Sequence, residues 1–259
     1  MIIQFPDNNE NQDSEKGKTF NGKIVINREL SLADDSWSEI AANVKNNPAA
    51  YKVGDTKQVT IDNKNYTVRV ANNTTPAECS GTDFSQTACG FVVEFVDIVE
   101  ERPINSTQTN VGGWEASEMR TYANGDFFNK LPSDLQSVIK STKVVSGHGS
   151  KDTSNFTSTD KIYLLSAHEV WEDGTSNQVS TFDTAWNNTR RLDYYKNLGV
   201  TTDSYSGAKK KNNGSNSRWW LRVASSHRRN FFLIVYDDGA WTDTAADAAY
   251  GFAPAFRIG

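Results

Sequence analysis

Runs of apolar residues with two different periods predict a mixture of helix and strands in the first hundred residues. In 35–44 the apolar residues fall at 37, 40, 41 and 44 behind an Asp–Ser pair, which is the spacing of a capped amphipathic helix. Residues 51–61 and 66–70 alternate on either side of a polar turn, which predicts a hairpin. The run 90–99 is rich in branched aliphatic and aromatic residues, so we expect a strand near the centre of a sheet.

The middle of the chain changes to helical patterns. Apolar residues at 114, 119, 122, 127 and 128 predict a helix over about 115–124, and a Pro–Ser opening predicts a second helix over 132–140. Shorter signals predict a strand at 161–165, a helical turn at 166–171, a helix at 190–197, and a loop rich in Asn, Gly, Ser and Lys at 206–216.

The C-terminal segment predicts one further strand, Phe231 to Tyr236, followed by an Asp–Asp–Gly turn. Its odd-numbered residues share one face, and Phe232, Ile234 and Tyr236 share the other. If only the first face is buried, the second is an apolar and aromatic surface that could bind a partner. If both faces are buried, the strand lies inside a sandwich. Alternation alone leaves these two interpretations open.

The order of elements fits one α+β domain over 23–259 better than two domains, and we find no internal repeat. A short strand is expected at 23–26. Residues 1–22 are polar and poor in branched aliphatics, which predicts a flexible N-terminal arm. Met1 is not followed by a basic region and an apolar core, so no signal peptide is expected and the cellular location stays open.

Charge and hydropathy argue against two classes of partner. The 259 residues include 27 Lys and Arg against 32 Asp and Glu, with a net charge of −5 and a mean hydropathy of −0.62. A mildly acidic chain is poorly suited to nucleic acid, and no stretch approaches the roughly 20 apolar residues of a bilayer span. We therefore expect no nucleic-acid partner and no membrane insertion. The basic run 209–211 is interpreted as a solubilising loop.

Three residue types are missing from the end of the chain. All 16 Lys, 12 Glu and 7 Gln lie at or before Lys211, and residues 212–259 contain none. Burial would remove Lys and Glu from a C-terminal sheet. However, the same segment keeps Ser, His, Arg, Asn, Asp and Thr between 225 and 247. It therefore lacks Lys, Glu and Gln while it keeps other polar residue types.

Candidate catalytic and metal-binding groups are scattered, so we expect no enzyme, no cofactor and no metal. His148, His168 and His227 show no ligand spacing, and no serine lies in a nucleophile-elbow motif. The aspartates at 237, 238, 243 and 247 match no EF-hand loop. Cys79 and Cys89 could form a disulfide worth about 3 kcal/mol or remain reduced thiols, and the sequence does not decide between them.

Several short motifs along the chain resemble those of a known domain family. The pattern W-W-L-R, a polar spacer, F-x-x-x-V, D-G and Y-G-x-x-P-A-F-R-I runs from Trp219 to Ile258, and segments 53–57, 113–120, 131–135 and 162–166 also fit. Together these resemble a C-type-lectin-like domain family of bacteria, archaea and their viruses, over about Trp37 to Ile258. The resemblance implies a fold of small, mostly antiparallel sheets with a few packed helices and extensive loops.

Proteins of this kind include the variable proteins of diversity-generating retroelements, in which adenine-directed mutagenesis rewrites chosen codons near the C-terminus. Changes at the adenines of an Asn codon cannot yield Lys, Glu, Gln, Met or Trp. Residues 223–250 contain only reachable types except Trp241, which would be an unvaried position. The resemblance therefore implies a C-terminal variable region at about 223–250. The sequence lacks the triplets with which calcium-dependent lectins bind sugars, and its C-terminal half lacks the cysteines that enzymatic relatives use. The resemblance therefore implies neither calcium-dependent sugar binding nor enzyme activity.

The resulting hypothesis is a receptor or adhesion protein that binds a protein or glycan non-covalently, expected on a cell or virion surface, with an undetermined oligomeric state. The alternative is a structural or attachment module whose fixed C-terminal surface packs against another subunit. The predicted ligand-binding residues are Ser225, Ser226, His227, Arg228, Arg229, Asn230, Phe232, Ile234, Tyr236, Asp237, Ala240, Thr242, Asp243, Thr244 and Asp247. The predicted framework residues are Trp219, Trp220, Arg222, Trp241 and Phe256.

Overall fold

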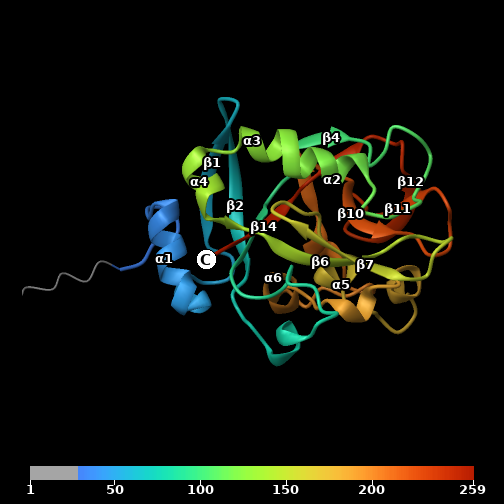
Figure 1. Cartoon of the computed structure of the whole chain (residues 1–259), viewed down its shortest axis with the longest axis horizontal. Coiled ribbons are helices and arrows are strands. Elements are labelled where there is room, and N and C mark those ends of the chain that lie inside the picture. Colours follow the sequence, from blue (N-terminus) through green and yellow to red (C-terminus); the bar gives the residue numbers. More distant parts are fainter. Residues whose placement is uncertain (1–28) are drawn as a thin grey trace, which may run out of the picture.

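The computed structural model describes residues 29–259, which form an α+β arrangement of helices and mostly antiparallel sheets (Figure 1). The expected arm over 1–22 and strand at 23–26 lie outside the described residues. The helices are α1 (Trp37–Asn46), α2 (Glu118–Tyr122), α3 (Phe128–Lys130), α4 (Ser133–Val138), α5 (Ala167–Val170) and α6 (Asp193–Asn197). The strands are β1 (Thr56–Ile61), β2 (Lys64–Asn72), β3 (Val92–Phe95), β4 (Glu100–Arg102), β5 (Ile139–Lys140), β6 (Thr142–Gly147), β7 (Asn155–Asp160), β8 (Lys210–Asn212), β9 (Ser215–Ser217), β10 (Trp219–Ala224), β11 (Phe231–Val235), β12 (Trp241–Ala245), β13 (Tyr250–Phe252) and β14 (Ala255–Ile258).

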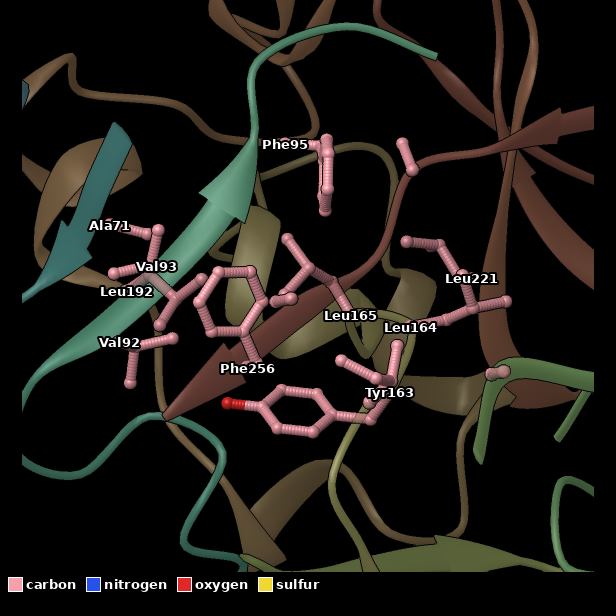
Figure 2. Packing of buried hydrophobic residues seen from close by; sticks show 14 of the residues in the cluster. Ala71, Val92, Val93, Phe95, Tyr163, Leu164, Leu165, Leu192, Leu221 and Phe256 are labelled. Carbon is pink, nitrogen blue, oxygen red and sulfur yellow. The ribbon is translucent and has the colours of Figure 1, made fainter. Parts of the chain in front are cut away.

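The first sheet, sheet A, joins the beginning of the chain to its end. Its strand order is β1-β2-β3-β14-β5, so β3 is central, as the run 90–99 predicted. The last strand, β14, pairs antiparallel with both β3 and β5. Figure 2 shows Phe256 of β14 among Val93 of β3, Tyr163 and Leu165. These four side chains are fully buried, so the C-terminal strand is part of the core.

Local sequence signals account for the elements that begin the domain. Ser36 caps α1, and its side chain and that of Glu39 form a capping box, as the Asp–Ser pair predicted. The hairpin β1–β2 turns at Asp62 and Asn63, which both adopt positive φ. The helix expected at about 115–124 begins at Glu118 and continues through a π-helical segment, Ala123–Phe127, into α3.

The second sheet, sheet B, carries the C-terminal region. Its order is β12-β11-β10-β13-β4, with all neighbours antiparallel except β10 and β13. All six residues of β10 are buried, and so are four of the five residues of β11. Because these residues are buried, β10 and β11 are covered on both faces. Sheet B lies on the opposite side of the molecule from α1 (Figure 1).

Several elements differ from the sequence predictions. The β6–β7 hairpin and β12 were not predicted, because their mixed Thr, Ser, Asp and Ala residues give no clear apolar alternation. The strand expected at 161–165 is reduced to a single bridge between Tyr163 and Ala255. The loop expected at 206–216 contains a short hairpin, β8–β9, that turns at Asn213 and Gly214.

The basic run at 209–211 also differs, because Lys210 is buried. Its Nζ lies 2.9 Å from Glu94 Oε2, and Arg69 Nη2 lies 2.8 Å from Glu94 Oε1. Burial lowers the pKa of Lys210 to about 8, against the opposing attraction of Glu94. The interpretation of this run as a solubilising loop is therefore wrong for Lys210, which anchors β8 to the centre of sheet A.

Cys79 and Cys89 form a disulfide, which settles the alternative that their spacing left open. The bridge closes a loop of the chain that contacts β6, because Gln86 N donates to Lys143 O at 2.8 Å. No helix within residues 29–259 is long and apolar enough to cross a bilayer.

Candidate functional site

The loop between β10 and β11 presents three charged or titratable side chains to solvent. His227, Arg228 and Arg229 are exposed, while Ser226 and Asn230 on either side are half-buried. The Arg228 side chain keeps 56% of its surface exposed, although its Nε lies 3.6 Å from Asp243 Oδ2. Three neighbouring predicted residues are thus available to a ligand.

Asn110, which lies far from this loop in sequence, holds its backbone in place. The Asn110 Nδ2 group donates to the main-chain oxygens of Ser225 at 3.1 Å, Arg228 at 2.6 Å and Phe231 at 2.9 Å. Its own backbone N–H donates to Arg229 O at 3.1 Å. Asn110 is buried. These contacts hold the loop through its main chain, and the hydroxyl groups of Ser225 and Ser226 add hydrogen bonds to Asp243 Oδ2 and Thr181 O.

The predicted apolar surface on β11 is wrong for two of its three residues. Phe232 and Ile234 are 0% and 1% exposed, so neither can contact a ligand from outside. Ser225 is also buried, and its Oγ donates to Asp243 Oδ2 at 2.9 Å. Tyr236 remains half-buried, with the Arg218 guanidinium 3.9 Å from its ring centroid. The sandwich interpretation of β11 is the correct one.

The rest of the predicted site lies along β12 and the turns at its two ends. Asp237, Asp238 and Asp247 are exposed. All five residues of β12 are half-buried, and Ala240 before them is half-buried as well. We define the C-terminal surface as Ser226 to Asn230, Tyr236 to Asp238, Ala240 to Ala245 and Asp247. Apart from the buried Ser225, Phe232 and Ile234, this surface contains every predicted ligand-binding residue.

An aromatic cluster at this surface includes a residue that the sequence reasoning missed. The Phe182 ring lies 4.2 Å from the His227 ring and 4.9 Å from the Trp241 ring, measured between centroids. Trp241 Nε1 donates to Asn177 Oδ1 at 3.1 Å. Phe182 also accepts at its main-chain oxygen from Ser226 N at 3.1 Å. The 177–182 segment therefore supports Trp241, the predicted framework residue, and one end of the loop.

The remaining framework residues are buried beneath the surface. Trp219, Trp220, Arg222 and Phe256 are all 0% exposed. Trp219 Nε1 donates to Ala208 O at 3.1 Å, and Trp220 Nε1 donates to the main-chain oxygen of Arg102 at 2.9 Å. These contacts are those of a fixed scaffold.

Arg222 has the most complete set of contacts, because each of its five N–H groups has an acceptor. Its Nη1 and Nη2 each lie 2.6 Å from a different oxygen of Glu169. The other acceptors are Ser146 Oγ at 3.0 Å, Leu164 O at 2.8 Å and Thr87 Oγ1 at 3.2 Å. Arg222 thus ties β10 to α5, to β6 and to the loop closed by the disulfide.

Glu169 matches this charge with its own hydrogen bonds. Its oxygens accept from Ser166 N at 2.9 Å, from Thr189 Oγ1 at 2.8 Å and from Thr87 Oγ1. Burial by itself would raise the pKa of Glu169, but the Arg222 charge and the hydrogen bonds outweigh it and lower the pKa. The pair is therefore ionised and fully hydrogen-bonded at neutral pH, which makes it structural.

The other two histidines stack on aromatic rings. The His168 ring stacks on Trp186 at 4.1 Å, and the His148 ring stacks on Phe156 at 4.9 Å. Among the residues from 29 onward, no group of three His, Cys, Asp or Glu residues could hold a metal ion. Burial raises the pKa of Asp183, whose carboxylate accepts from Ser166 Oγ at 2.9 Å.

Comparison with known proteins identifies a domain family. A family model described as a domain of unknown function (DUF6273) matches residues 92–259, from β3 to the end of the chain. The match includes the whole C-terminal surface and Asn110. No curated protein and no solved structure matches the chain.

Proposed function

The chain belongs to the DUF6273 family of domains of unknown function, and we propose that it is a ligand-binding protein that recognises a protein or glycan through its C-terminal surface. One observation carries the proposal. Asn110 fixes the backbone of the 225–231 loop through main-chain oxygens, while His227, Arg228 and Arg229 are exposed. The main-chain hydrogen bonds of such a loop do not require particular side chains at the exposed positions 227–229.

The energetics favour a surface whose side chains change. Substitutions at exposed positions usually alter stability by no more than about 0.5 kcal/mol. The buried framework beneath, including the Arg222–Glu169 pair, would lose several times as much. In such a protein, the residues that stabilise the fold are different from the residues that contact the ligand.

We further propose that this surface is diversified and that the fold is C-type-lectin-like. The missing Lys, Glu and Gln support diversification, because burial does not account for their absence. The six exposed polar positions 227, 228, 229, 237, 238 and 247 contain only His, Arg and Asp. Adenine-directed change of Asn codons reaches His, Arg and Asp but not Lys, Glu or Gln. The α+β architecture with antiparallel sheets supports the proposed fold.

Binding can be tested on an array of glycans and of secreted and cell-surface proteins. We compare the unmodified chain with a triple variant, His227→Ala, Arg228→Ala and Arg229→Ala. A matched control, Lys45→Ala with Lys52→Ala, removes two exposed positive charges elsewhere. We expect at least one target to bind the unmodified chain and the control, and to bind the triple variant at least tenfold more weakly. Failure of every target to bind, or equal binding by all three proteins, would contradict the proposal.

A further inference from the structure

The strand β12 is the outer edge of sheet B, and its register determines which main-chain groups point away from the sheet. Strand β12 pairs on one side with β11 and is the last strand in the order. Just beyond the ladder, Ala246 N donates to Asn230 O at 2.9 Å and Tyr236 N donates to Ala240 O at 2.6 Å. In an antiparallel ladder, hydrogen-bonded pairs alternate with non-hydrogen-bonded pairs.

This alternation places the outward-pointing groups at odd-numbered positions. The hydrogen bonds at 230–246 and 236–240 require that 242 and 244 also bond to β11. Trp241, Asp243 and Ala245 therefore direct their N–H and C=O groups outward. Within residues 29–259 the three N–H groups have no hydrogen-bond acceptor, and of the three C=O groups only that of Ala245 has a donor, Ala248 N at 3.1 Å. An edge of this kind is a template for another strand.

We propose that an extended segment of a protein ligand binds by adding a strand to β12. This inference rests on the proposed function and narrows it to a protein ligand, because a glycan cannot continue a backbone ladder. Main-chain hydrogen bonds would supply affinity, and the side chains along the edge would supply specificity. Changes of side chain in this region, except to proline, leave the N–H and C=O groups in place. A diversified surface would thus keep a constant source of affinity.

The side chains around the edge indicate the chemistry of that segment. Trp241 and Asp243 alternate with Thr242 and Thr244, so one face offers an aromatic ring and the other offers threonines. Exposed aspartates lie beyond both ends of the strand, at 237, 238 and 247. We therefore expect a ligand segment with β-branched or aromatic residues at its centre and Lys or Arg at its ends.

The same charges argue against a second copy of this chain as the occupant. Two antiparallel β12 strands related by a two-fold axis at residue 243 would place Asp243 opposite its own copy. Asp237 and Asp238 of one copy would also approach Asp247 of the other. Like charges directly opposite each other destabilise strand pairing, so the edge disfavours self-association.

Ala245 offers a substitution that removes one outward N–H with little change of side chain. Proline has no N–H and is tolerated on edge strands, and it favours an extended conformation at the preceding Thr244. We compare Ala245→Pro with the matched control Ala245→Ser, which keeps the N–H group. A thermal melt of each variant establishes that it is folded.

The probe is a phage-displayed library of linear decapeptides, selected on the full chain. We expect enriched peptides with β-branched centres and basic ends, which bind Ala245→Pro about tenfold more weakly and Ala245→Ser within twofold of the unmodified chain. Independently of any variant, hydrogen exchange should show that the amides of Trp241, Asp243 and Ala245 become protected when a selected peptide binds.

Different results would contradict strand addition to β12 and ligand binding by the C-terminal surface. Peptides that lose affinity for the His227, Arg228 and Arg229 triple variant, but bind Ala245→Pro normally and leave the three amides unprotected, would overturn strand addition and keep the C-terminal surface as the site. Dimerisation of the chain through β12 at micromolar concentration would also overturn it. A library that yields no binder to the full chain would count against strand addition, whereas the array of glycans and proteins would still test the proposed function.

Discussion

Replacing Asn110 with alanine tests whether the 225–231 loop is held from outside. The amide group of Asn110 contacts three main-chain oxygens at 2.6, 2.9 and 3.1 Å, and the side chain is buried. Each net hydrogen bond is worth about 1 kcal/mol, and a buried carbonyl left without a donor costs about 1–3 kcal/mol. Because an amide has two hydrogens, we count two bonds and expect a loss of about 2–3 kcal/mol in the free energy of unfolding.

Two measurements report this loss. For a chain of this size, about 2–3 kcal/mol corresponds to a fall in Tm of roughly 4–12 °C. Hydrogen exchange should also accelerate at the amides of Ser225 and Ala246, whose acceptors are Phe231 O and Asn230 O. The control His227→Ala, in the same loop but exposed, should change the free energy of unfolding by no more than about 0.5 kcal/mol.

The reverse pattern would show that Asn110 does not hold the loop. If Asn110→Ala unfolds within 0.5 kcal/mol of the unmodified chain and the amides of the loop exchange as before, then the loop does not depend on Asn110. If His227→Ala destabilises the chain as much as Asn110→Ala does, then the loop depends on its own side chains. In that case it could not tolerate a varied sequence.

Three further predictions concern the scaffold. Arg222→Met should lower the free energy of unfolding by about 3–5 kcal/mol in urea titrations, because it leaves the buried Glu169 carboxylate unpaired. A loss of less than about 1 kcal/mol would contradict a stabilising role for the Arg222–Glu169 pair. The pKa values of Glu169 and Glu94 are lowered from 4.5, so the contribution of these groups to the free energy of unfolding is complete above pH 4.5 and is lost as the pH falls through their folded-state pKa values. Urea titrations at a series of acidic pH values should show this decline. The decline should be smaller in Glu169→Gln. Substituting both Cys79 and Cys89 with serine should cost about 2–3 kcal/mol, and reductant should have no further effect on that variant in thermal melts.

The elements that sequence predicted correctly are those with strong local signals. The Asp–Ser cap before α1, the polar turn between β1 and β2, and the aliphatic run of β3 each act through neighbours in the chain. Strand β12 escaped prediction because its Trp-Thr-Asp-Thr-Ala sequence has no buried face, and edge strands of this kind lack apolar alternation.

The errors at the site come from contacts that are distant in sequence. Alternation in β11 could not show whether one face or both are covered, and the structure buries Phe232 and Ile234. Asn110 and Phe182 carried no signal, because a polar residue in a loop and a single aromatic residue are common and their partners lie 118 and 45 residues away. Lys210 shows the same limit, since a run of lysines is ordinarily solvated and its carboxylate partner is Glu94.

We propose that the exposed positions of the C-terminal surface vary to recognise ligands while the buried positions stay fixed. The most direct test is to sequence residues 212–259 in many clones from one population, together with the neighbouring DNA. We expect substitutions at exposed positions such as 227–229, 237, 238 and 247, without Lys, Glu or Gln, and an adjacent reverse transcriptase with a near-copy of the 3′ end of the gene. Trp219, Trp220 and Arg222 should be invariant. A uniform sequence across the clones would contradict diversification and favour a fixed surface that packs against another subunit.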